Sequence, residues 1–65
     1  MKHTLSIYPK NCRKNIREIH RMIGVGEETA YSMILMTAAL MDLRPDDEEV
    51  VEYILEDCGI YPEPA

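Results

Sequence analysis

The feature that most constrains this chain is a stretch from Thr29 to Met41 that contains no charged side chain. Glu27 and Glu28 precede it and suit the first turn of a helix, because carboxylates complement the positive end of the helix dipole. The expected helix covers roughly residues 27–42 and has almost no polar face. A helix that is apolar nearly all round is a buried one. In a chain of 65 residues it would be the central element, covered by its own chain and by a partner.

The N-terminal segment alternates in the way of a strand. Thr4, Ser6 and Tyr8 would point one way, and Leu5 and Ile7 the other. A lone strand leaves its backbone groups unpaired, and the sequence offers no second strand. We therefore expect the same strand of a second copy to pair with it, which makes the protein a homodimer.

A first helix is expected between this strand and residue 24. Pro9 closes the strand and suits a helix start, Asn11 is a candidate N-cap, and Gly24 is a candidate C-terminal residue. The apolar residues recur at the spacing of one helix face: Cys12, Ile16, Ile19 and Ile23. Basic residues follow another face: Lys10, Lys14, Arg17 and Arg21.

A third, acidic helix is expected after the break at residues 43–45. Asp46 and Glu49 resemble a capping box, and Gly59 ends the helix with Ile60 folding back on Leu55. Its apolar residues share one face: Val50, Val51, Ile54, Leu55 and Cys58. Residues 44–65, this helix and a short tail, would belong to the same domain as the core of residues 1–43. The helix would cap that core, or alternatively dock a partner.

Charge is divided along the chain. Residues 1–21 hold six basic residues and one acidic residue, a net charge of +5, whereas residues 22–65 hold one basic and eleven acidic residues, a net charge of −10. A chain of net charge −5 binds polyanions poorly without specific contacts. Only the basic N-terminal third is suited to approach phosphate.

Several function classes are not expected. His3 and His20 fall on different elements, and we find no catalytic triad spacing, phosphate loop or cation loop, so neither an enzyme nor a metal or cofactor site is predicted. We find no signal peptide and no apolar run long enough to span a membrane. Cys12 and Cys58 lack metal-type neighbours and are expected to be reduced and buried. The prediction is a cytoplasmic protein.

The order strand, helix, glycine turn, helix resembles the ribbon-helix-helix family of transcription regulators (the Arc, MetJ and CopG group). The resemblance covers about residues 1–40 and rests on the strand Lys2 to Tyr8, Pro9, Ile16, Ile19, Ile23 and Gly24-Val25. It implies a mainly α fold in which two strands pair antiparallel across an intertwined homodimer, here with an additional C-terminal helix. In that family the paired strands enter the major groove of DNA.

The resemblance also implies roles for individual residues. The outward strand side chains would contact base edges: Thr4, Ser6 and Tyr8. Phosphates would be contacted by the strand's first residue and by the start of the second helix: Lys2, Gly26 and Glu27. The dimer core would include Leu5, Ile7 and Ile34. The implied function is sequence-specific binding of double-stranded DNA, as a transcriptional repressor of a bacterium, phage, plasmid or archaeal virus.

Two alternatives stay open. The strand lacks the Arg, Asn or Gln that make bidentate base contacts, and Glu27 and Glu28 would repel a phosphate. These features favour a small acidic protein-interaction module, such as an antitoxin or a phage-encoded inhibitor of a host protein, which binds through the acidic C-terminal helix. The competing fold is a helix-turn-helix with its recognition helix over residues 27–32.

Overall fold

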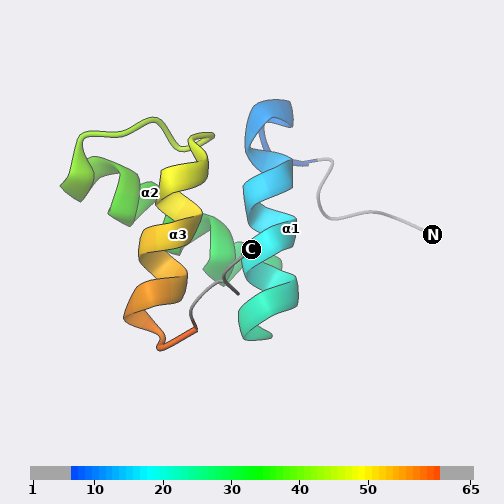
Figure 1. Cartoon of the computed structure of the whole chain (residues 1–65). Helices are drawn as coiled ribbons and strands as arrows, with labels where there is room; N and C mark the ends of the chain where they lie inside the picture. Colours follow the sequence, from blue (N-terminus) through cyan, green and yellow to red (C-terminus); the bar gives the residue numbers. More distant parts are fainter. Residues whose placement is uncertain (1–6, 61–65) are drawn as a thin grey trace.

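The computed structural model describes residues 7–60 of the chain. In this range a short 3-10 turn, η2 (Lys10–Cys12), leads into α1 (Arg13–Ile23), α2 (Glu27–Met41) and α3 (Glu48–Asp57). Each of these three helices packs on the other two. Figure 1 shows α1 and α3 side by side, with α2 passing behind both of them.

The mainly α prediction is confirmed, but the predicted ribbon-helix-helix fold is wrong. No strand occurs among residues 7–60, and the described end of the expected strand, Ile7 and Tyr8, forms a 3-10 turn and a bend. The Tyr8 ring lies against that of Tyr31 in α2, with ring centroids 4.9 Å apart. The Arg13 Nε donates a hydrogen bond of 3.2 Å to the Tyr8 carbonyl oxygen. In a paired strand, this oxygen would instead accept a hydrogen bond from the backbone of the neighbouring strand. The remainder of the expected strand lies outside the described residues.

One hydrophobic core lies where the three helices meet. Its fully buried members include Ile16 and Ile19 of α1, Ile34 of α2 and Val50 of α3. Helix α2 contributes one buried residue per turn: Ala30, Ile34 and Ala38. Helix α3 contributes a broader face: Val50, Val51, Ile54 and Leu55. The C-terminal helix therefore completes the core of its own chain.

The helices end at the residues that the sequence predicts, but the N-cap of α3 lies one residue later than expected. Gly24 ends α1 in the left-handed conformation, at a φ of 86°. After α3, the Ile60 N–H donates to the Leu55 carbonyl at 2.8 Å, as the sequence predicts. The N-cap of α3 is Asp47, whose carboxylate accepts from the Glu49 N–H at 3.0 Å, so the predicted cap at Asp46 is wrong by one residue.

Asp46 serves a different contact. Its Oδ2 accepts a hydrogen bond of 3.2 Å from the Asn11 side chain and one of 3.1 Å from Arg44. The Asn11 hydrogen bond is the main reason that the pKa of the Asp46 carboxyl is lowered, and the positive charge of Arg44 acts in the same direction. Asn11, predicted as an N-cap, thus tethers the α2–α3 connection to the start of α1.

Asn15 makes the strongest link of this kind. It is 3% exposed, and its side-chain nitrogen donates to the carbonyl oxygens of Pro45 and Asp47, both at 2.9 Å. A polar group that is removed from water without a hydrogen-bond partner destabilises the folded state. The two bonds therefore fix the connection between α2 and α3 against α1, and Asp47 is the residue from which α3 begins.

We predict that Asn15→Ala lowers the free energy of unfolding by about 1–3 kcal/mol, because it removes two hydrogen bonds that join α1 to the α2–α3 connection, although the Asp47 carbonyl oxygen still accepts from the Val50 N–H at 3.1 Å. Lys14→Ala is the matched control. Its ammonium pairs with Glu48 at 3.2 Å, but both side chains are about three-quarters exposed, so the loss should stay below about 1 kcal/mol. Urea denaturation followed by circular dichroism measures both. Equal losses in the two variants would contradict the role given to Asn15.

A second prediction concerns Asp42, which ends α2 at a φ of 58° and is the non-glycine residue with a positive φ in residues 7–60. The left-handed conformation is unfavourable for a residue with a side chain, and a carboxylate at a helix C-terminus opposes the dipole. Asp42→Gly should raise the free energy of unfolding by about 1 kcal/mol. Asp42→Asn removes only the charge and should stabilise less. If the two variants melt at the same temperature, the backbone conformation carries no cost.

Candidate functional site

The side of α2 that faces away from the core is exposed and uncharged. Met36 is 65% exposed and Leu40 is 83% exposed, and residues four apart lie on the same helix face. We call this surface the outer face of α2; it consists of Thr29, Ser32, Leu35, Met36, Ala39 and Leu40, all exposed. It lies opposite the buried stripe, so neither α1 nor α3 covers it.

Charged residues bound the outer face at both ends. Glu27 and Glu28 occupy the first turn of α2. Just beyond the last turn, the side chain of Arg44 is 80% exposed, with one guanidinium nitrogen bonded to Asp46. The face is thus an apolar strip with carboxylates at its beginning, and the exposed Asp42 and the ion pair of Arg44 with Asp46 follow its last turn.

The sequence predicts α2 to be covered by its own chain and by a partner. Its own chain covers only the narrow stripe, and cover by a partner stays a prediction. Ile34, expected in a dimer core, is fully buried among residues of its own chain, so a second copy could not contact it without opening that core. Ile7, also expected there, is 74% exposed, and Leu5 lies outside the described residues.

The residues predicted to read DNA do not come together in the described range. Tyr8 is half-buried against Tyr31, and burial raises the pKa of its hydroxyl, as do the nearby carboxylates of Glu28 and Glu27. Gly26 is the exposed N-cap of α2 and is followed directly by Glu27, so a carboxylate stands where a phosphate would dock. Lys2, Thr4 and Ser6 lie outside the described residues.

The basic residues of α1 are partly neutralised within the chain. Lys14 pairs with Glu48 of α3 at 3.2 Å. Arg21 pairs with Glu18 one turn earlier, also at 3.2 Å. The acidic helix α3 supplies one of these two carboxylates, so the chain itself neutralises part of the basic stripe.

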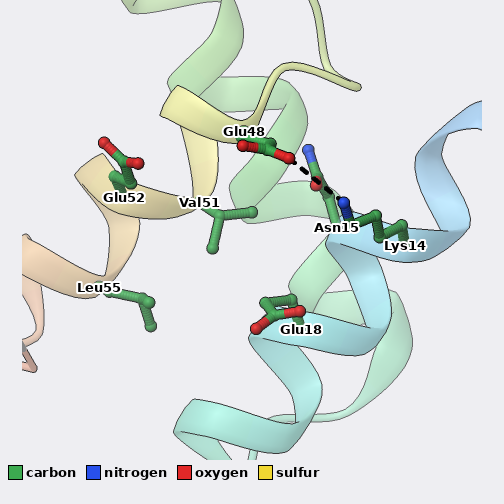
Figure 2. Close-up of a pocket in the computed structure, with 7 residues that line it drawn as sticks. All are labelled: Lys14, Asn15, Glu18, Glu48, Val51, Glu52 and Leu55. Carbon is green, nitrogen blue, oxygen red and sulfur yellow. Dashed lines mark hydrogen bonds and ion pairs between the residues drawn. The ribbon is translucent and has the colours of Figure 1, made fainter. Parts of the chain in front are cut away.

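A shallow groove of about 260 Å³ lies between α1 and α3. Figure 2 shows Val51 and Leu55 directed from α3 toward α1, while Glu52 is directed away. The Lys14–Glu48 ion pair spans one end of the groove. Two carboxylates that line the groove, Glu18 and Glu48, pair with cations of their own chain.

The two thiols are free and differ in exposure. Cys12 is buried at 3% exposure, whereas Cys58, predicted to be buried, is exposed at the end of α3. The periodicity places Cys58 on the apolar face, but the helix ends at Asp57 and the chain turns away. Burial raises the pKa of the Cys12 thiol, and the carboxylate of Asp46 raises it further.

This difference predicts unequal thiol chemistry. Only the thiolate reacts with electrophiles, so Cys12 should be inert in the folded chain and Cys58 should react at once. Mass spectrometry after brief alkylation at neutral pH should find one label, and two labels in denaturant. Cys58→Ser should abolish the native label. Rapid labelling of native Cys58→Ser would contradict the burial of Cys12.

No protein-family model, curated protein or solved structure matches the chain. Residues 7–60 contain no group of His, Cys, Asp or Glu side chains that could hold a metal ion. Within the same range, every helix is too short or too polar to cross a lipid bilayer.

Proposed function

We propose that this chain is a small helical protein-interaction module that binds a partner through the outer face of α2. The observation that carries the proposal is the exposure of Met36 and Leu40 within a run free of charged residues. Contiguous exposed apolar side chains mark interaction sites, whereas scattered ones do not. Apolar residues at helical spacing are also the form in which a helix is recognised by a groove on its partner.

Magnitudes set what kind of binding this face can support. Complete burial of a side chain such as Leu40 or Met36 contributes about 1.5–3 kcal/mol. Association costs about 4–15 kcal/mol in lost freedom of motion. Two or three such side chains offset the lower end of that cost only when the partner also buries apolar surface. The favoured partner is therefore a protein with an apolar face of similar size.

DNA binding has less support from the described residues. The proposed major-groove contact depends on a paired strand, and the ribbon-helix-helix fold is wrong. In the helix-turn-helix alternative, the three residues 24–26 do join α1 and α2. However, the second helix would then present Glu27 and Glu28 and the apolar outer face toward a phosphate backbone, which repels carboxylates.

The proposal differs from the sequence-based alternative in the surface that binds. In that alternative the acidic helix is the docking element; its apolar residues are buried in the core, whereas the carboxylates of Glu49, Glu52 and Glu56 stay exposed. Docking through α2 leaves that core intact. A cytoplasmic location is part of the proposal, and it is supported by the free state of Cys12 and Cys58, since reducing compartments keep thiols in that form.

The proposal is tested by placing a photo-crosslinking amino acid at Leu40 in cells that produce the chain. We expect a protein adduct of defined mass that is lost when Met36→Glu is added, because a charge on the same face must be desolvated on binding. The helix should tolerate this variant, since glutamate is a good helix former and the site is exposed.

The matched control places the crosslinker at Glu52, an exposed site on α3. It should give no such adduct. The proposal is wrong if Leu40 and Glu52 yield the same products, or if Met36→Glu leaves the Leu40 adduct unchanged while circular dichroism shows a folded chain.

A further inference from the structure

Resting on the proposed function, we propose that Met36 is a redox-sensitive modification site, at which oxidation by a hydroperoxide releases the partner from the outer face of α2. Three features of the molecule support this assignment: the exposure of Met36, its place on the helix, and the lack of charged side chains on the same face. The proposal holds for any partner that buries Met36.

Met36 is the most exposed methionine of residues 7–60. It is 65% exposed, whereas Met22 is 42% and Met41 is 41% exposed. Met33 is half-buried and packs against the core. An oxidant must reach the sulfur from solvent, so an accessible methionine is oxidised before a covered one. We therefore expect Met36 to be the first methionine of this range to react.

The position of Met36 separates its oxidation from the stability of the fold. Met36 follows the fully buried Ile34 by two residues, which places it about 200° around the helix axis and almost opposite the core. An oxygen atom added to its sulfur is therefore solvated in the free chain. Oxidation at this position should leave the three-helix fold intact, unlike oxidation of a methionine inside a core.

The apolar surroundings of Met36 make its oxidation costly for binding. No charged side chain lies between Thr29 and Met41, and Leu40 shares the outer face with Met36. A thioether is apolar, whereas a sulfoxide carries a strong hydrogen-bond acceptor. We expect oxidation to weaken binding about tenfold or more, because a partner that covers this face removes the new acceptor from water without supplying a donor.

The modification is a two-electron oxidation that can be reversed. A lone pair of the Met36 sulfur attacks the terminal oxygen of the hydroperoxide, an S–O bond forms as the O–O bond breaks, and the proton of the transferred hydroxyl passes to the leaving oxygen. With hydrogen peroxide the products are the sulfoxide and one water molecule. Methionine sulfoxide reductases reverse the step with two thiols, which become a disulfide while the oxygen leaves as water.

The order of oxidation is measured on the whole chain carrying Cys58→Ser, because the exposed thiol would otherwise consume the oxidant. Hydrogen peroxide is added at neutral pH, and mass spectrometry of peptides follows the gain of one oxygen atom at each methionine. We expect Met36 to react several times faster than Met33, with the two rates converging in denaturant. Circular dichroism should show an unchanged fold. A Met36 rate no higher than that of Met33, or loss of the fold when Met36 alone is oxidised, overturns the proposal.

The effect on binding is measured with the photo-crosslinking amino acid at Leu40. The chain is oxidised, freed of peroxide and added to an extract of the cells that give the adduct. The oxidised chain should lose the adduct, and methionine sulfoxide reductases of both stereospecificities should restore it. Met36→Leu is the matched control. It keeps an apolar side chain but has no sulfur at this position, so its adduct should survive the peroxide treatment.

The outcomes separate this inference from the proposed function. If the untreated chain gives no adduct at Leu40, the proposed function is wrong, and the release of a partner by oxidation is wrong with it. If the untreated chain gives the adduct and the oxidised chain keeps it, the proposed function stands and the redox site is wrong. Loss of the adduct from peroxide-treated Met36→Leu would likewise overturn the assignment to Met36.

Discussion

The side chain of Asn15 is the contact on which the arrangement of the helices depends. By bonding the carbonyl groups of Pro45 and Asp47, it fixes the end of the α2–α3 connection to α1. Helix α3 begins at that point and must then lie beside α1, as Figure 1 shows. Both helices consequently occupy the same side of α2. The exposure of the outer face thus follows from a polar contact on the other side of the molecule.

The fold uses only part of the apolar content of α2. The core requires one small or branched residue per turn, supplied by Ala30, Ile34 and Ala38. Polar residues at Met36 and Leu40 would leave this core unchanged and would favour solubility. Exposed apolar side chains at these two positions support the proposed contact with a partner.

The sequence predicts what local rules decide. The apolar periodicity holds along α1 and along α3 as far as Leu55, and the glycine ends hold at Gly24 and Gly59, because each depends on neighbours within a turn. The strand fails because alternation over a few residues is a weak signal against the packing of Tyr8 on Tyr31, which lies far along the chain. Asn15 lies on the apolar face of α1. A polar residue on an apolar face indicates a buried hydrogen-bonding side chain, so the sequence does contain a signal for this contact. The outer face could not be located, since a helix with apolar residues on every side does not indicate which side is covered.

The distribution of charge reinforces the separation between fold and binding surface. Basic α1 and acidic α3 pack together, and contacts such as Lys14–Glu48 and Asn11–Asp46 join their charged and polar groups. The net charge of −5 would keep copies of the chain apart at long range, but physiological salt screens such repulsion beyond about 8 Å. At shorter distances, the free-energy cost of contact comes from charged side chains that must lose their hydration water. Along α2, from Thr29 to Met41, no side chain carries an ion. An apolar partner can therefore approach this helix closely at the lowest desolvation cost.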